Sequence, residues 1–175
     1  MTHLILGGAR SGKSRHAQNL AASSGLPVTV IATGQARDAE MAARIARHQA
    51  ERPPHWRTVE QPLYLAAALQ QAAGAGRCVL IDCLTLWLMN LLEAGDSVFA
   101  HERAALLAAL PACCGEIILV SNEVGLGVIP LGELSRRFVD EAGWLNQDIA
   151  RLAENVTFVA AGLPLSLKSF TKEIV

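Results

Sequence analysis

Short apolar runs recur along the chain, and stretches with helical periodicity separate them. The apolar runs cover residues 4–6, 28–32, 78–81, 117–120 and 156–160. Their length and their β-branched residues are typical of buried strands. Helical spacing is found over residues 13–23, 38–52, 63–73, 84–93, 101–110 and 131–154. The pattern therefore predicts strands and helices that alternate along the chain.

This alternation predicts a mostly parallel sheet with helices on both faces, which is an α/β fold of three layers. Parallel strands that are buried on both faces need a strongly apolar chain, and 51% of the 175 residues are hydrophobic. The chain is long enough for one sizeable core and short for two. Because no repeat or linker is visible, we expect a single domain over residues 1–175.

The balance of charges gives no sign of a nucleic-acid partner. The chain has 15 Lys and Arg against 16 Asp and Glu, a net charge of −1, and no basic stripe stands out. No targeting leader precedes the first strand, and no apolar stretch reaches the roughly 18 residues that a membrane span needs. We therefore expect a cytoplasmic protein without a membrane span.

The four cysteines suggest no special chemistry. They are Cys78, Cys83, Cys113 and Cys114, and none belongs to a C-x-x-C pair. This spacing favours neither a disulfide framework nor a zinc site. Buried or incidental thiols are the interpretation that we prefer.

The strongest motif lies between the first predicted strand and the first predicted helix. Residues 7–14 read GGARSGKS, a full match to the phosphate-binding pattern G-x-x-x-x-G-K-[ST]. In such a loop the glycines let successive N–H groups point at phosphate oxygens, and the helix N-terminus adds positive potential. We expect Lys13 to reach the β- and γ-phosphates of a nucleoside triphosphate, and the Ser14 hydroxyl to hold Mg²⁺.

Polar residues end two other predicted strands. Asp82 follows residues 78–81, where a carboxylate is a costly buried charge unless it holds a cation such as Mg²⁺. The alternative is that Asp82 caps the helix that begins at Leu84. Asn122 and Glu123 follow residues 117–120 in the same way. Both can face the reacting groups, because ligands collect at the carboxyl ends of strands, but a cap or loop role explains them equally well.

A histidine lies among arginines on the second predicted helix. At about 100° per residue, Met41, Arg44, Ile45, His48 and Arg52 share roughly one third of the helix circumference. One interpretation makes His48 a boundary residue beside two apolar neighbours. The other makes it a nucleophile toward a polyphosphate, with the arginines stabilising charge on phosphorus. The spacing leaves both interpretations open.

Longer segments resemble one family of enzymes. They are GGARSGKSRHAQ (7–18), IATGQARDAEMAARIARHQAERPPHWRTVE (31–60), LIDCLTLWLMNLL (80–92) and SNEVGLGVIP (121–130). In this order they are similar to the bifunctional adenosylcobinamide kinase/adenosylcobinamide-phosphate guanylyltransferase family of cobalamin biosynthesis. The resemblance continues over residues 137–150 and 162–168, and thus covers nearly the whole chain. It implies a three-layer P-loop NTPase-like, RecA-like fold.

The resemblance implies two reactions. ATP or GTP first phosphorylates the aminopropanol hydroxyl of adenosylcobinamide, and GTP then donates GMP to that phosphate, which gives adenosylcobinamide-GDP and pyrophosphate. A histidine carries the guanylyl group in this family, and the segment RIARHQAERP assigns that role to His48. The resemblance also implies a homo-oligomer, a trimer whose active site lies near a subunit boundary.

The same resemblance implies which residues contact the nucleotide. They belong to the phosphate loop, to the end of the second strand, to the end of the basic helix and to two acidic positions. The set is Gly7, Gly8, Ala9, Arg10, Ser11, Gly12, Lys13, Ser14, Ala32, Thr33, Gly34, Gln49, Ala50, Glu51, Arg52, Glu60 and Asp82. Lys13 is expected to be catalytic as well. Since some relatives are expected to carry serine at position 34, the glycine there implies a contact through the backbone.

Two other functions compete with this one. A monofunctional small-molecule kinase would keep Lys13, Ser14 and Asp82 but form no covalent intermediate. A nucleotide-dependent switch protein would use hydrolysis only as a timer. The chain lacks both the N-K-x-D segment of switch GTPases and the arginine-rich lid of nucleoside monophosphate kinases. A covalent GMP adduct would separate the bifunctional enzyme from both alternatives.

Overall fold

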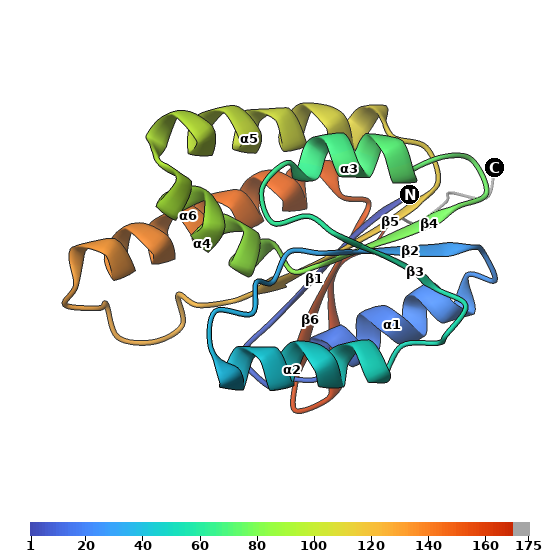
Figure 1. The fold of residues 1–175 in the computed structure, drawn as a ribbon, viewed down its shortest axis with the longest axis horizontal. Helices are drawn as coiled ribbons and strands as arrows, with labels where there is room; N and C mark the ends of the chain where they lie inside the picture. The colour runs from blue at the N-terminus through green and yellow to red at the C-terminus, as the bar shows by residue number, and fades with distance from the viewer. Residues whose placement is uncertain (170–175) are drawn as a thin grey trace.

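The computed structural model describes residues 1–169, and the described strands form one sheet (Figure 1). The strands lie side by side in the order β3-β2-β4-β5-β1-β6-β7. In chain order they are β1 (Thr2–Gly7), β2 (Val28–Ala32), β3 (Arg57–Glu60), β4 (Cys78–Asp82), β5 (Glu116–Asn122), β6 (Asn155–Ala160) and β7 (Leu163–Lys168). Strands β1 to β6 pair in parallel, and β7 runs antiparallel to β6. The predicted mostly parallel sheet is confirmed.

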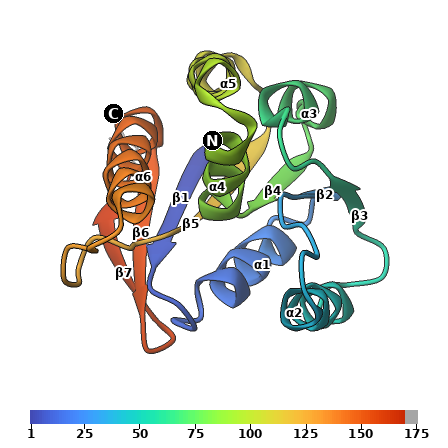
Figure 2. The same ribbon diagram turned by 60° about the vertical axis from the view of Figure 1, so that its left-hand side comes forward.

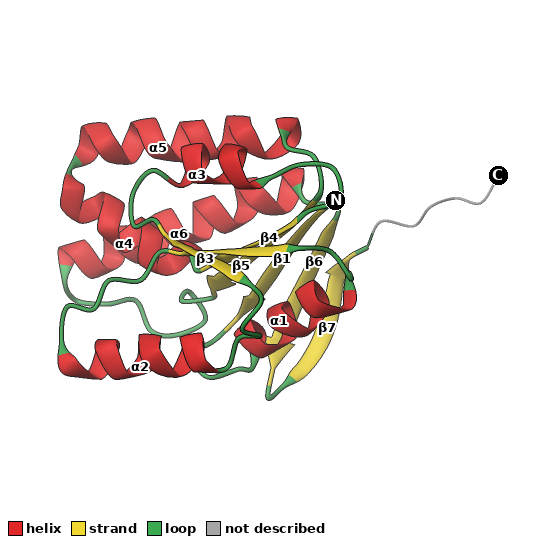
Figure 3. Cartoon of the chain, turned by 45° about the vertical axis from the view of Figure 1, so that its right-hand side comes forward, coloured by secondary structure: helices red, strands yellow, loops and turns green. Residues whose placement is uncertain are grey.

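Helices cover both faces of this sheet. They are α1 (Lys13–Ser23), α2 (Ala39–Ala50), α3 (Leu65–Ala72), α4 (Leu84–Ala94), α5 (Asp96–Ala109) and α6 (Glu133–Leu152), with a short 3-10 helix at Leu110–Ala112. Figure 3 shows α1 and α2 below the sheet and α3 to α6 above it. The predicted three layers are therefore confirmed. None of the described helices combines the length and the apolar character that a membrane span requires.

Successive residues of a strand pack into two different apolar cores, one on each face of the sheet. On β1, Leu4 and Leu6 face the larger core, which α3, α4, α5 and α6 cover, whereas Ile5 faces the smaller core beside α1. This alternation follows from the two-residue repeat of a strand. Ala17 and Ala21 of α1 are fully buried in the smaller core. Their small side chains let α1 lie close to the sheet, directly behind the phosphate-binding motif.

The strands β3 and β7 were not predicted. In β3 the segment Arg57–Glu60 carries only one apolar residue, Val59, so its edge position at β2 comes from backbone pairing rather than from burial. In β7, Leu163, Leu165 and Leu167 alternate with other residues, which is a strand signal, but the strand is exposed along its whole length. Both lie at the edges of the sheet, where the apolar signal is weakest.

Most of the predicted helix ranges differ from the observed ones by a few residues, and two differences have a clear local cause. The fifth helix begins at Asp96 rather than near residue 101, because Gly95, with a φ of 102°, separates it from α4 after a single residue. The second helix begins at Ala39, since the Asp38 side chain caps it by accepting a hydrogen bond from the Met41 N–H at 2.7 Å. The four cysteines are free, with Cys78 and Cys83 buried and Cys114 exposed.

Candidate nucleotide-binding site

A cavity of about 110 Å³ lies where the carboxyl ends of β2, β4 and β5 meet the start of α1 and one side of α2. Its position agrees with the rule that open α/β sheets bind ligands at the carboxyl ends of their strands. The lining residues are Lys13, Ser14, Ala32, Gly34, Met41, Arg44, Ile45, His48, Gln49, Arg52, Glu60, Asp82, Cys83, Leu86 and Asn122. The cavity thus joins segments that are far apart in the sequence.

The phosphate loop connects β1 to α1 at one end of this cavity. Glycine is required at its first position, because a Cβ on Gly7 would lie 2.5 Å from the carbonyl oxygen of Val159 and 2.6 Å from the Ser11 hydroxyl. Gly12 adopts a φ of 95°, in the left-handed region that glycine favours, and α1 begins at the next residue. The backbone is therefore bent tightly enough to turn its N–H groups toward an anion.

The turn between β6 and β7 supports the phosphate loop from outside. The Gly162 N–H donates to the carbonyl oxygen of Ser11 at 2.8 Å, and a Cβ on Gly12 would lie 3.1 Å from the Gly162 Cα. This contact gives Gly162, which begins the resembling segment 162–168, a structural role at the phosphate loop.

Three charged side chains lie close together in the cavity. The Lys13 ammonium group donates to the carbonyl oxygen of Gly8 at 3.0 Å, and the Arg52 guanidinium lies 3.8 Å from the Asp82 carboxylate. Burial lowers the pKa of Lys13 and of Arg52, and the nearby negative charge of Asp82 partly opposes the shift in both. Two buried cations beside one carboxylate leave excess positive charge, which suits a polyphosphate.

His48 lies on the wall that α2 contributes. Its Nδ1 is buried without a hydrogen-bond partner in the part of the chain that the structure describes, and it is 3.7 Å from the Glu51 carboxylate, too far for a hydrogen bond. The Nε and one terminal nitrogen of Arg52 are also buried without a partner. Such atoms are normally satisfied in a folded protein. Their position in the cavity is therefore consistent with a ligand that supplies acceptors.

A second, more open groove of about 960 Å³ continues from the cavity between α1 and α2, which Figure 2 shows side by side below the sheet. Lys13, Ser14, Arg44 and His48 line both spaces. The rest of the groove is lined by Arg10, Ser11, Gly12, Arg15, Gln18, Asn19, Glu40, Ala43, Arg47 and Glu51. Since five of its lining residues are Arg or Lys against two Glu, the groove favours anions.

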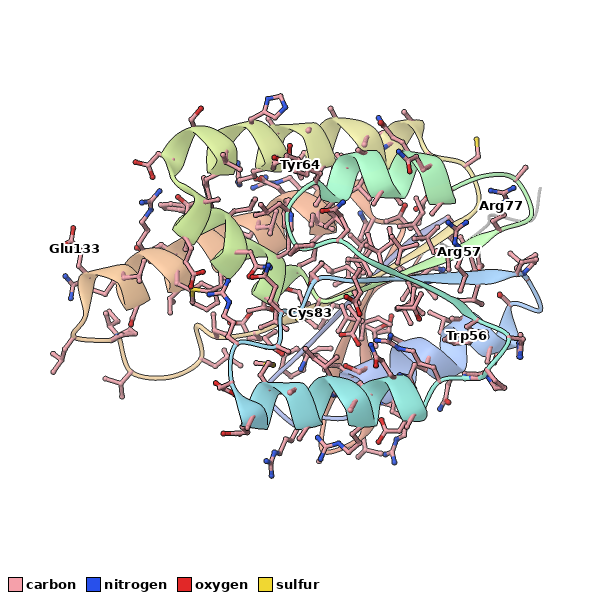
Figure 4. The ribbon with its side chains drawn as sticks, viewed as in Figure 1. Trp56, Arg57, Tyr64, Arg77, Cys83 and Glu133 are labelled. Atoms are coloured by element: carbon pink, nitrogen blue, oxygen red, sulfur yellow. The ribbon has the colours of Figure 1, made fainter. Side chains whose placement is uncertain are left out.

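A buried network fixes the edge of the cavity near β2. The Thr33 hydroxyl donates to the Cys83 carbonyl oxygen at 2.6 Å and accepts from the Cys83 N–H at 2.9 Å. The Asn90 side chain donates to the carbonyl oxygens of Thr33 and Pro62 at 2.9 and 3.0 Å. Figure 4 shows Cys83 near the middle of the molecule, where β4 passes into α4. Burial raises the pKa of the Cys83 thiol to about 11, which makes it a poor nucleophile.

The structure brings most of the predicted site residues together. Nine of them line the cavity: Lys13, Ser14, Ala32, Gly34, His48, Gln49, Arg52, Glu60 and Asp82. Arg10, Ser11, Gly12 and Glu51 line the groove. Gly7, Gly8, Ala9, Thr33 and Ala50 line neither space, and the Thr33 hydroxyl is engaged with Cys83.

Six lining residues are not among the site residues that the resemblance implied: Met41, Arg44, Ile45, Cys83, Leu86 and Asn122. The first three lie on α2, Cys83 directly precedes α4, Leu86 lies in the first turn of α4, and Asn122 ends β5. The position of Asn122 at the polar end of a predicted strand already indicated that it could face a ligand. Nothing in the local pattern distinguished Cys83 or Leu86 from core residues. They reach the cavity because α4 starts directly after the carboxyl end of β4.

The residues present fit a magnesium ion bound together with phosphate. Ser14 and Asp82 line the same cavity and offer a hydroxyl and a carboxylate oxygen, the ligands that Mg²⁺ prefers. Asp82 does not cap α4, since the capping position is Cys83 and no side chain bonds there. Within residues 1–169, no group of three or more His, Cys, Asp or Glu side chains could hold a metal alone. Mg²⁺ does not need such a cage, because it usually keeps waters and substrate phosphates as ligands.

Known solved structures share the fold. A protein from Pyrococcus horikoshii OT3, described as a structural study of project PH0250, aligns with 99% of this chain and 89% of its own, with a TM-score of 0.57 and 11% identity. The RadB recombinase aligns with 90% of this chain and 73% of its own, with a TM-score of 0.50 and 13% identity. These likenesses support the predicted RecA-like fold and nothing more specific.

Sequence comparisons are more specific. A family model described as cobinamide kinase / cobinamide phosphate guanyltransferase matches residues 3–167. The bifunctional adenosylcobalamin biosynthesis protein CobP of Pseudomonas aeruginosa is 65% identical, over 96% of this chain and 98% of its own. The CobU protein of Escherichia coli, which carries the same bifunctional description, is 40% identical over 96% of this chain and 100% of its own. The chain therefore belongs to the cobinamide kinase / cobinamide phosphate guanyltransferase family.

Proposed function

We propose that this chain is a bifunctional enzyme that phosphorylates adenosylcobinamide with ATP or GTP and then transfers GMP from GTP to adenosylcobinamide phosphate. Membership of the family supports both activities. We further propose that residues 1–175 form one catalytic domain, which the continuous sheet supports. The cytoplasmic location stays a prediction.

The observation that carries this proposal is the position of His48. It lines both the cavity and the groove, beside Lys13 and Ser14 of the phosphate loop. A histidine in this position can reach a phosphorus atom of a triphosphate that the loop holds. The buried, unpartnered nitrogens of Arg52 support an anion at the same place. This convergence supports the nucleophile interpretation of His48 over the boundary interpretation.

In the kinase reaction, the aminopropanol hydroxyl attacks the γ-phosphorus of the triphosphate. The bond between the γ-phosphorus and the bridging oxygen breaks, the nucleoside diphosphate leaves, and the hydroxyl proton passes to solvent. The N–H groups of the phosphate loop and the Lys13 ammonium stabilise negative charge on the β- and γ-phosphates. Ser14 and Asp82 would hold Mg²⁺, which supplies further charge neutralisation when bound.

In the guanylyltransferase reaction, a nitrogen of His48 attacks the α-phosphorus of GTP, and pyrophosphate leaves. The product is a phosphoramidate that joins GMP to the histidine. A phosphate oxygen of adenosylcobinamide phosphate then attacks the same phosphorus, the P–N bond breaks, and His48 is restored as the diphosphate forms. Arg44 and Arg52 lie in the same cavity and can stabilise charge on the phosphorus during both displacements.

The decisive experiment is incubation with Mg²⁺ and GTP labelled at either the α- or the γ-phosphate. We expect the α-label to stay on the protein in a bond that survives alkali and breaks in acid, and the γ-label to leave. Adenosylcobinamide phosphate should discharge the adduct into adenosylcobinamide-GDP, as covalent catalysis requires. Peptide mapping of the label to His16, His55 or a lysine would overturn the assignment of His48.

We also propose that the protein forms a homo-oligomer, most simply the trimer implied by the resemblance. Large apolar side chains are exposed along the loop after β5 and on α6, and exposed apolar surface of this kind is common at protein interfaces. They include Leu126, Val128, Ile129, Leu131, Leu134 and Trp144. The exposed edge strand β7 adds Leu163, Leu165 and Leu167. Light scattering after gel filtration tests the assembly: a trimer mass is expected, and a monomer mass would contradict it.

A further inference from the structure

Asn122 is the last residue of β5, the strand that lies between β1 and β4 in the sheet. Strand β5 pairs with β1 on one side and with β4 on the other, so it lies between the strand that leads into the phosphate loop and the strand that ends at Asp82. Asn122 pairs with Gly7, the first glycine of the loop, while Asp82 pairs with Val120. Asn122 therefore lies between the phosphate loop and the acidic residue, slightly beyond the latter.

Backbone contacts from three elements hold this position. The Asn122 N–H donates to the Thr85 hydroxyl of α4 at 2.7 Å, and its carbonyl oxygen accepts from the Asn146 side chain of α6 at 3.4 Å. The N–H of the next residue, Glu123, donates to the Gly7 carbonyl oxygen at 3.1 Å. Thr85 and Asn146 are themselves buried. The backbone of Asn122 is thus satisfied and fixed, which leaves its side chain to face the cavity.

The side-chain oxygen of Asn122 has no hydrogen-bond partner among residues 1–169. Its Oδ1 is buried without a hydrogen bond, although the residue lines the cavity with Lys13, Ser14 and Asp82. A buried acceptor without a donor destabilises the fold. The arrangement therefore indicates that a ligand supplies the donor.

The chemistry of the two reactions limits what that donor can be. The oxygens of a nucleoside triphosphate accept hydrogen bonds, so they do not satisfy another acceptor such as Oδ1. The phosphate that enters the guanylyltransferase reaction is likewise an acceptor. The substrate hydroxyl of the kinase reaction is a donor, and Asn122 lies between the phosphate loop and Asp82, on the side of the cavity where the phosphates are expected. A water molecule on Mg²⁺ is the other donor that could reach this place.

We propose that the Asn122 side chain binds and orients the acceptor hydroxyl of the kinase reaction, an inference that rests on the proposed function. The hydroxyl donates to Oδ1, which aims an oxygen lone pair at the γ-phosphorus. The new P–O bond forms as the bond to the bridging oxygen breaks. The hydroxyl proton leaves to solvent, since an amide is too weak a base to keep it. Asn122 thereby serves the kinase reaction and has no donor to bind in the guanylylation of His48.

The test compares the two reactions in the same preparation of full-length protein. Asn122→Ala should lower kcat for adenosylcobinamide phosphorylation by about a hundred-fold, the loss expected when a reacting group is misplaced. The KM for the triphosphate should change little, and the ratio of kinase rate to acid-labile GMP adduct formation should fall by a similar factor. Asn122→Asp, which keeps an acceptor oxygen, should restore part of the kinase rate. Gln147→Ala removes an exposed carboxamide from α6 and serves as the matched control.

Three results would overturn the inference. A parallel loss of kinase and adduct formation would make Asn122 a support of the whole site, and thermal unfolding of the variant would show whether the loss is one of folding. A shift of the Mg²⁺ titration in both reactions would assign Oδ1 to metal-bound water. An unchanged kinase rate would remove the residue from the mechanism. Failure of the proposed function is distinguishable, because the parent protein would then show no kinase turnover at all.

Discussion

Helices α1 and α2 flank the same phosphate site, but the fold holds them very differently. Lys13, Ala17 and Ala21 of α1 are buried against the sheet. No residue of α2 is fully buried, and its apolar contacts include the approach of Ile45 to Gly34. The phosphate loop is thus built into the core, whereas the histidine is presented by a helix on the surface. The difference suggests that the two reactions have separate structural supports. The phosphate loop and α1 hold the triphosphate for both reactions, whereas α2 carries the histidine that only guanylyl transfer needs.

The largest effect that would test this separation is expected from His48→Ala. Without the nucleophile, the GMP adduct and guanylyl transfer should fall by at least about a thousand-fold, while kinase turnover survives because the phosphate loop is intact. Rates of both reactions, measured on the same preparation, check this. His55→Ala, which changes an exposed histidine beyond α2, is the matched control. Loss of kinase activity in His48→Ala would show that the kinase reaction also depends on α2, so that the two reactions do not have separate structural supports.

Lys13→Ala should reduce both activities. Its ammonium group is the main cation at the loop, and loss of such a group costs about a hundred-fold. Calorimetry should show weaker triphosphate binding, with thermal unfolding little changed. Arg77→Ala removes an exposed cation at the amino end of β4, away from the site, and should bind normally (Figure 4). Unchanged GTP affinity together with unchanged kinase turnover would exclude the phosphate loop from the mechanism.

Asp82→Asn should shift the metal requirement. The change removes a charge but nearly keeps the shape, so both reactions should need roughly ten-fold more Mg²⁺. Activity titrations with Mg²⁺ measure the shift, with Asp140→Asn on the exposed side of α6 as the control. Overlapping titrations of Asp82→Asn and the parent would make Asp82 a partner of Arg52 rather than a metal ligand.

The smallest expected effect is on backbone dynamics. Helices with few buried contacts open locally more often than helices in the core, so amide hydrogens of α2 should exchange faster than those of α1. GTP should slow exchange in α2 more than in α1, because α2 has more stabilisation to gain. Hydrogen exchange with mass spectrometry measures both. Equal protection of the two helices without GTP would remove the contrast between them.

Local sequence patterns predicted much of the fold. The buried strands and the loop between β1 and α1 were predicted correctly because they depend on short-range features, namely apolar runs and clustered glycines. That this loop binds phosphate stays a prediction. The edge strands β3 and β7 were missed because neither is buried, so their pairing partners rather than their own residues decide their conformation. The role of His48 as the nucleophile that carries GMP came from the resemblance to a family and stays a prediction.

The sequence by itself determined which chemical groups are present, and the tertiary structure decided which of them meet. The pattern left two roles open for Asp82, and the observed start of α4 at Leu84, after the cap residue Cys83 and without a side-chain cap, disfavours the capping role. It left Asn122 equally open, and the unpartnered Oδ1 in the cavity favours a ligand contact. Neither result could be read from the chain, because burial and hydrogen-bond partners depend on residues that are distant in sequence. Only the parallel sheet brings the ends of β1, β4 and β5 together.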